Sequence, residues 1–169
     1  DAGGIKARDW HKAVIYTTAH AHHCLDKAYR IAGVGEAVRR DVPMDDRYRM
    51  DAGALQKAID EDRRAGLLPW LIVAAAGTTD VGAIDPLDRI GDIARHEKLW
   101  FHVDAAYGGF FLLTKEGREK LRGIENSDSV VMDPHKGLFL PYGSGAVIVR
   151  DRSHLLQSHQ YQAAYMQDA

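Results

Sequence analysis

Residues 99–106 are Leu-Trp-Phe-His-Val-Asp-Ala-Ala, a mainly apolar, strand-like run to Val103 followed by an acidic residue and two alanines. Similar runs recur along this 169-residue chain. The other strand-like runs, all rich in β-branched or aromatic residues, are 14–18, 70–75, 129–132 and 146–150. Apolar residues at helical spacing occur between these runs, near 22–33, 51–65, 86–97 and 115–123. Strands that alternate with helices and are apolar on both faces predict an α/β fold with a largely parallel sheet and helices on both faces.

Some local signals refine this prediction. Asp51 is a predicted N-cap for the second helix, and Pro86 is placed in the first turn of the third, where its missing donor costs little. The short connection from Lys136 to Gly145 also allows an antiparallel neighbour at that point. Ligands of open α/β sheets bind beyond the carboxyl ends of the strands, so we expect Thr79 and Asp104 to share one rim.

Composition narrows the class of protein. The formal net charge of −2 lacks the basic excess of nucleic-acid-binding proteins, and the longest apolar stretch, 67–76, is about half of a membrane span. We therefore expect no nucleic-acid or membrane partner. The polar N-terminus does not resemble a signal peptide, so we expect a cytoplasmic protein. Cys24 is the only cysteine, which excludes an internal disulfide. No internal boundary is visible, so 1–169 is predicted to be one domain, and both ends indicate a piece of something longer.

Asp104 and Lys136 together indicate a pyridoxal phosphate site. A lysine that follows a strand end can form an imine with the cofactor aldehyde, and a carboxylate can keep the pyridine nitrogen protonated. An unpaired carboxylate at the end of a buried strand is costly, and a protonated ring nitrogen would provide its partner. The small residues at 105, 106, 108 and 109 either let a flat ring approach the backbone or serve tight packing.

The histidines leave alternatives open. His20, His22 and His23 form a cluster that could ligate a metal, although such a cluster has low specificity and we expect no metal site. His102 alternates with Asp104 and should face the same side of its strand, in a supporting or core role. His135 precedes the lysine and could donate to a phosphate oxygen, or could serve only the turn.

With these residues in place, the chain resembles the fold-type I, pyridoxal phosphate-dependent amino-acid decarboxylases, the group that contains aromatic-L-amino-acid and glutamate decarboxylases. The resemblance covers almost the whole chain. It depends on four segments, which occur in the family's order and at similar intervals: residues 21–22, 77–79, 102–109 and 134–136.

The resemblance implies roles for particular residues. His22 is similar to the histidine stacked on the pyridine ring, Asp104 to the partner of its nitrogen, and Lys136 to the Schiff-base lysine. Ala106 is similar to the residue on the opposite ring face. The remaining two assignments are Thr79, near cofactor and substrate, and His135, at the phosphate.

Two positions in the chain stand apart from this pattern. Relatives often carry asparagine where this chain has Asp133, and because a carboxylate would repel a phosphate, Asp133 is not assigned to phosphate binding. Tyr165 lies at about the interval after the lysine where aromatic amino-acid decarboxylases place a mobile-loop tyrosine that returns a proton.

The family's upstream phosphate-binding segment and downstream small domain are absent from this chain, which would then be the central part of a large cofactor-binding domain.

These features predict an enzyme that decarboxylates an L-amino acid, aromatic by preference, to its amine and carbon dioxide. Glutamate, diaminobutyrate and other acids remain open as substrates. We expect activity to require the companion segments and a second subunit, since family active sites lie at a homodimer interface, and we expect the isolated piece to be inactive. The alternatives are an aminotransferase or another lyase, a metal-dependent hydrolase using His20, His22, His102 and Asp104, and a non-catalytic binding domain.

Overall fold

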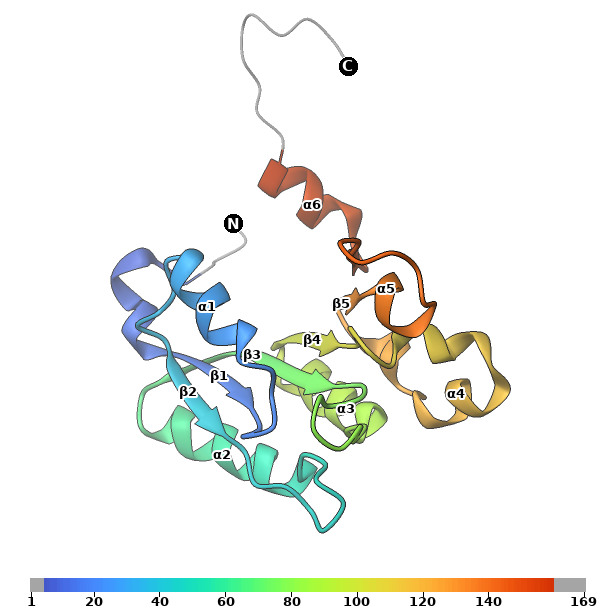
Figure 1. Cartoon of the computed structure of the whole chain (residues 1–169). Coiled ribbons are helices and arrows are strands. Elements are labelled where there is room, and N and C mark those ends of the chain that lie inside the picture. The colour runs from blue at the N-terminus through green and yellow to red at the C-terminus, as the bar shows by residue number, and fades with distance from the viewer. Residues whose placement is uncertain (1–4, 160–169) are drawn as a thin grey trace, which may run out of the picture.

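A single six-stranded sheet organises the protein in a computed structural model that describes residues 5–159 (Figure 1). The strand order is β2-β1-β3-β4-β5-β6, and the neighbours pair in parallel except for β5 and β6, which are antiparallel. The strands are β1 (Ala13–Thr17), β2 (Val38–Asp41), β3 (Leu68–Ala75), β4 (Trp100–Asp104), β5 (Ser129–Met132) and β6 (Ala146–Val149). The predicted, largely parallel α/β sheet is confirmed, and the antiparallel neighbour follows the short connection that allowed it.

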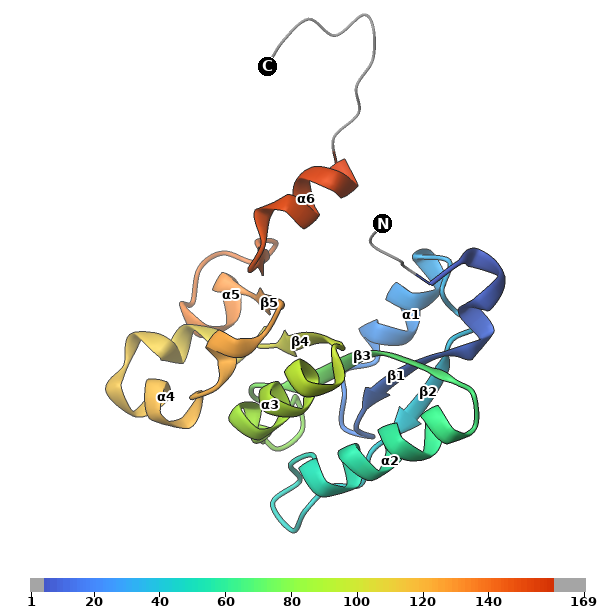
Figure 2. The same cartoon turned by 180° about the vertical axis from the view of Figure 1, so that it is seen from behind.

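Helices lie on both faces of this sheet, but they cover the faces unequally. In Figures 1 and 2, α2 and α3 lie on one face and α1 lies on the other. The α-helices are α1 (Cys24–Ile31), α2 (Ala52–Arg64), α3 (Leu87–Glu97), α4 (Lys115–Lys120), α5 (Pro134–Gly137) and α6 (Arg152–His159). Three short 3-10 helices are η1 (Ala7–Lys12), η2 (Gly109–Leu113) and η3 (Ile124–Asn126). Helix α1 has no buried residue, so its side of the sheet remains partly open.

The hydrophobic core fills the space between the sheet and the pair α2 and α3. Phe101 and Val103 of β4 are fully buried there, against helix residues that include Leu55 and Ile90. Because side chains alternate along a strand, the remaining β4 residues, Trp100, His102 and Asp104, are directed to the α1 face and are only half-buried. Packing of the core therefore determines which face of the sheet carries the polar side chains.

A buried polar network links the first two strands to α2. Tyr16 donates a hydrogen bond from its hydroxyl to Asp62 Oδ2 at 3.0 Å, and Arg40 contacts both oxygens of the same carboxylate. Burial raises the pKa of Tyr16 well above its usual value, and the negative charge of Asp62 raises it further. This phenol therefore stays protonated and acts as a donor, which satisfies the buried carboxylate.

Helix starts follow the expected chemistry with one small shift. Asp51 caps α2, and its side chain accepts hydrogen bonds from the backbone N–H groups of Gly53 and Ala54. Pro86 occupies the N-cap of α3, one position before the helix rather than within its first turn. Its missing N–H donor is harmless there, because the first N–H groups of a helix have no acceptor within the helix.

Strand β2 and the C-terminal helix α6 were not among the predicted elements. Strand β2 is an edge strand that carries Arg39, Arg40 and Asp41, so it lacks the apolar run that marks the inner strands. Within residues 5–159, no helix is long and apolar enough to cross a membrane.

Candidate active site

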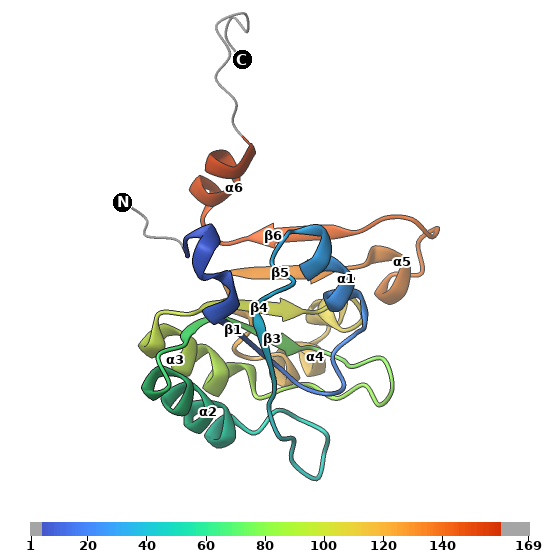
Figure 3. The ribbon, with the colours of Figure 1, turned by 90° about the vertical axis from the view of Figure 1, so that its left-hand side faces the viewer.

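A cavity of about 650 Å³ lies on the α1 side of the sheet, beyond the carboxyl ends of β1, β3, β4 and β5. In Figure 3 the arrowheads of β3 and β4 point to the side on which α5 lies. The chain crosses from β2 past β1 to β3, and such a reversal of strand order opens a crevice at the sheet edge. The cavity is lined by six residues predicted from the sequence, His22, Thr79, Asp104, Ala106, His135 and Lys136.

Asp104 ends β4 at the floor of this cavity. Its backbone pairs with Ala75 of β3 and Val131 of β5, so neighbouring strands fix its position on both sides. Its Oδ1 accepts a hydrogen bond from the backbone N–H of Ala106 at 3.1 Å. The second carboxylate oxygen has no partner among the described residues and can accept from a ligand that offers an N–H group.

The turn after Asp104 brings the backbone of β4 against the end of β3. A Cβ atom on Gly108 would lie 2.0 Å from the carbonyl oxygen of Ala76, and one on Gly109 would lie 2.7 Å from Met132 Cε. Both glycines are therefore required by packing within the protein, which decides between the two readings of these small residues. Ala106 is the member of the run that faces the cavity.

Lys136 reaches the same cavity from the short helix α5. Its Nζ lies 2.9 Å from Asp133 Oδ2, and about two fifths of its side chain is exposed. His135 Nδ1 lies 2.7 Å from the carbonyl oxygen of Ser144, and its ring packs 4.6 Å from that of Tyr142. The turn contact predicted for His135 is present, while its ring still lines the cavity.

The three histidines after β1 do not converge on one point. His22 and His23 have ring centroids 4.1 Å apart, and His22 Nδ1 accepts a hydrogen bond from the backbone N–H of Cys24. His20 is directed instead toward Asp80, with Nδ1 and Oδ2 3.6 Å apart. No group of three or more His, Cys, Asp or Glu side chains in residues 5–159 is arranged to hold a metal ion, so the hydrolase alternative gains no support.

His102 lines the cavity beside Asp104, as the alternation along β4 predicts. Its Nδ1 lies 2.8 Å from the hydroxyl of Ser129. Burial lowers the pKa of His102, and the Asp104 carboxylate opposes this only in part. The lowered pKa favours the neutral form of the imidazole beside Asp104.

Several cavity residues were not singled out by sequence reasoning. Thr17 ends β1 and is buried, and its hydroxyl finds no hydrogen-bond partner within the described part of the chain. Cys24 lies close enough to Asp104 and Lys136 for both charges to act on it, and burial, followed by Asp104, raises the pKa of its thiol. The available signal for Thr17 was its position at the end of a buried strand.

The cavity suits the cofactor indicated by the sequence. Its volume is in the range of small-molecule sites, and it combines one amine, one carboxylate with a free oxygen and an unpartnered hydroxyl. These are the groups needed to attach an aldehyde, pair with a ring nitrogen and donate to an oxygen. Tyr165 lies outside the described residues, so its predicted role stays a prediction.

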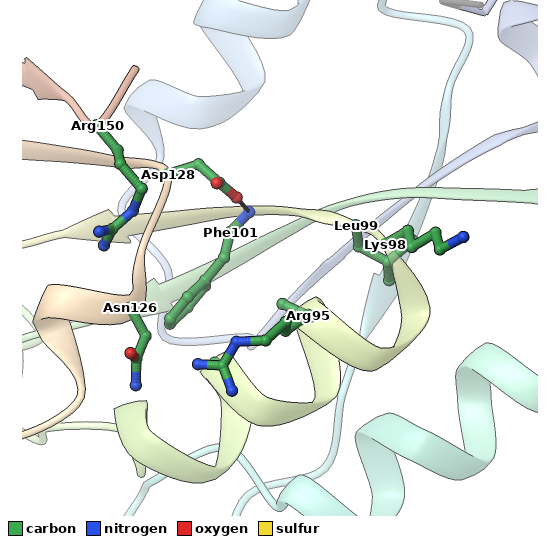
Figure 4. A pocket seen from close by; sticks show the side chains of 9 residues that line it. Arg95, Lys98, Leu99, Phe101, Asn126, Asp128 and Arg150 are labelled. Carbon is green, nitrogen blue, oxygen red and sulfur yellow. Dashed lines mark hydrogen bonds between the residues drawn. The ribbon is translucent and has the colours of Figure 1, made fainter.

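A second hollow, of about 430 Å³, lies on the opposite face of the sheet, next to α3 (Figure 4). The side chains of Arg95, Asn126 and Arg150 border it beside the ring of Phe101. None of the predicted site residues lines it. The chemistry indicated by the sequence therefore belongs to the cavity on the α1 face.

Comparison with known proteins agrees with this geometry. A family model described as the pyridoxal-dependent decarboxylase conserved domain matches residues 4–169. The aromatic-L-amino-acid decarboxylase of Bacillus atrophaeus is 35% identical over 161 residues, which are 95% of this chain and 34% of that protein. The cysteine sulfinic acid decarboxylase of Mus musculus is 40% identical over 153 residues, or 90% of this chain and 31% of that protein.

A solved structure shares the same fold. The crystal structure of Oryza sativa TDC with PLP and tryptamine superposes with a TM-score of 0.88 at 33% sequence identity, covering 99% of this chain and 34% of that one. The chain thus spans about a third of the length of the relatives that it matches.

Proposed function

This chain belongs to the pyridoxal-dependent decarboxylase family, and we propose that it carries the cofactor-binding centre of an enzyme that decarboxylates an L-amino acid to its amine and carbon dioxide. The observation that supports this most directly is the meeting of Asp104 and Lys136 in one cavity of suitable size. An aminotransferase or another lyase would use the same pair of groups, but the proteins named above are decarboxylases.

Bound pyridoxal phosphate supplies a conjugated pyridinium that accepts the electron pair left when the bond to the substrate carboxylate breaks. The free oxygen of Asp104 would hold the proton on the ring nitrogen, because the other oxygen is already engaged by the Ala106 N–H. Lys136 would supply the Nζ to which the cofactor aldehyde is attached and which the substrate amine replaces.

The remaining residues orient the ring and its substituents. His22, Ala106 and Thr79 line the cavity. His22 and Ala106 would hold the two faces of the ring, and Thr79 would border both cofactor and substrate. His135 would contact the phosphate through Nε2, which could donate to it with the ring protonated, because Nδ1 already donates to the Ser144 carbonyl. Tyr165 returns a proton to Cα after carbon dioxide leaves.

An aromatic amino acid is the proposed substrate, although the relatives named above include one that acts on an acidic amino acid, cysteine sulfinic acid. We further propose that activity requires the segments that the relatives possess in addition, together with a second subunit of a homodimer, and that the isolated 169-residue chain is inactive. Cytoplasmic residence is part of the same proposal.

The test uses the full-length protein incubated with pyridoxal phosphate, then reduced with borohydride to fix the cofactor to its lysine. We expect peptide mapping to find the cofactor on Lys136, and Lys136→Ala to abolish the attachment. Lys115→Ala, a change of an exposed lysine outside the cavity, is the matched control. Attachment at another lysine would refute the assignment.

The reaction itself is tested with a panel of amino acids. Release of carbon dioxide together with the amine supports decarboxylation, whereas formation of the keto acid would show that a different Cα bond is broken. Comparison of aromatic with acidic substrates in the same panel decides the substrate class.

A further inference from the structure

Asp133 has no assigned role in the proposed site, yet it makes the ion pair of the essential lysine. Its Oδ2 lies 2.9 Å from Lys136 Nζ. Within residues 5–159, Lys136 pairs with this carboxylate and not with Asp104, although both carboxylates line the same cavity. The lysine amine and its counter-ion are therefore three residues apart in one turn.

The side chain of Asp133 is directed to the lysine at the expense of another contact. Asp133 occupies the N-cap position of α5, where an aspartate normally accepts a hydrogen bond from the free N–H groups of the first turn. Its side chain makes no such bond here. The backbone is fixed on both sides, because the Asp133 N–H donates to Ala106 and its carbonyl oxygen accepts from Lys136.

We propose that Asp133 is a positioning residue that holds the Lys136 ammonium group whenever this lysine is not bonded to the cofactor. The inference rests on the proposed function of Lys136. A paired ammonium has no free electron pair with which to attack an aldehyde, so the ion pair must separate before attachment. Once the substrate amine has displaced Lys136 and the released amine has taken up a proton, the Asp133 carboxylate would pair with it again, which favours the substrate-bound state.

A different effect of this carboxylate has to be separated from the ion pair. The charge of Asp133 could act by repelling the phosphate of the cofactor rather than by holding the lysine. Pyridoxal, which has the aldehyde but lacks the phosphate, distinguishes the two effects. Asparagine at this position keeps the shape of the side chain and removes its charge.

The first experiment needs no cofactor. Cofactor-free, full-length wild type, Asp133→Asn and the control Asp151→Asn are acylated with a limiting amount of acetic anhydride, and labelled lysines are quantified by mass spectrometry. Asp151 is an exposed carboxylate outside the cavity. Relative to the exposed Lys115, Lys136 should react roughly two- to fivefold faster in Asp133→Asn, as expected for loss of a partly exposed ion pair, and at an unchanged rate in Asp151→Asn.

The second experiment measures attachment to Lys136 with pyridoxal phosphate and with pyridoxal. A similar acceleration with both compounds in Asp133→Asn supports the proposal. Acceleration with pyridoxal phosphate alone would assign the effect to phosphate repulsion and overturn it, as would unchanged or slower labelling of Lys136.

Should Asp133→Asn fail to fold, the wild type still decides the matter. Labelling of Lys136 relative to Lys115 must rise between low and high salt, because salt screens a partly exposed pair, and a constant ratio contradicts the proposal. Absence of trapped cofactor on wild-type Lys136 would refute the proposed function, whereas the labelling result decides the role of Asp133 separately.

Discussion

Replacement of Gly108 by alanine tests how closely the turn that follows Asp104 is fitted to the sheet. The backbone at Gly108 has φ −83° and ψ −16°, which alanine adopts without strain. The added Cβ would nevertheless lie 2.0 Å from the carbonyl oxygen of Ala76, whereas ordinary contact begins at 3.4 Å. The two groups must therefore separate by about 1.4 Å.

The displacement has a cost that can be approximated from the contacts involved. Ala76 cannot retreat freely, because its N–H donates to the carbonyl oxygen of Asp104 at 2.8 Å. Overpacking costs about 1–3 kcal/mol and a lost hydrogen bond about 1 kcal/mol, so we expect Gly108→Ala to lower the free energy of unfolding by about 2–4 kcal/mol. Since Asp104 and Ala106 border the same turn, cofactor occupancy should fall as well.

The assay is urea denaturation of the cofactor-free, full-length protein, with unfolding monitored by circular dichroism. Gly35→Ala is the matched control, because a Cβ at Gly35 meets Arg30 Cγ at 3.5 Å and Arg30 Cα at 3.8 Å, both ordinary contacts. Its effect should stay within about 0.5 kcal/mol. Equal denaturation midpoints for the two variants would show that the turn yields easily and would refute the packing argument.

Four further predictions concern Asp62, His102 and Lys98. Asp62→Ala leaves the buried Tyr16 hydroxyl and the half-exposed Arg40 without their carboxylate and should cost about 2–3 kcal/mol, while the exposed Asp60→Ala changes the denaturation midpoint little; similar midpoints would contradict the network. By NMR titration, the pKa of His102 should lie below its usual 6.5 and fall further in Asp104→Asn, because the carboxylate partly offsets burial; an unchanged pKa in that variant would contradict this. The unfolded chain then binds this proton more readily, so His102 should reduce stability as pH falls below about 6.5, and His102→Gln should remove that decline. Lys98→Gly should raise stability by about 1 kcal/mol, since the C-cap lysine has φ 57°; an unchanged midpoint in urea would count against strain there.

The inner strands could be predicted because their sequences carry a strong apolar signal. Strands β1, β3, β4 and β5 are inner members of the sheet, and their predicted ranges agree with the structure to within two residues at each end. Strand β2 pairs on one side only and exposes arginine side chains, so its composition resembles that of a loop. Pairing with β1, a tertiary interaction, makes this segment a strand.

The position of Asp104 was predictable for a different reason from that of Lys136. Burial of Phe101 and Val103 against the helices determines the register of β4, and a shift by one residue would place Asp104 in the core. The direction of Asp104 is thus a consequence of core packing, which the alternating sequence already contains. Lys136 lies within the four-residue helix α5, which has no buried residue, so no apolar pattern directs its side chain. Its direction depends on the charge of Asp133, which is why the ion pair became visible only in the structure and why changing Asp133 should affect Lys136 without disturbing β4.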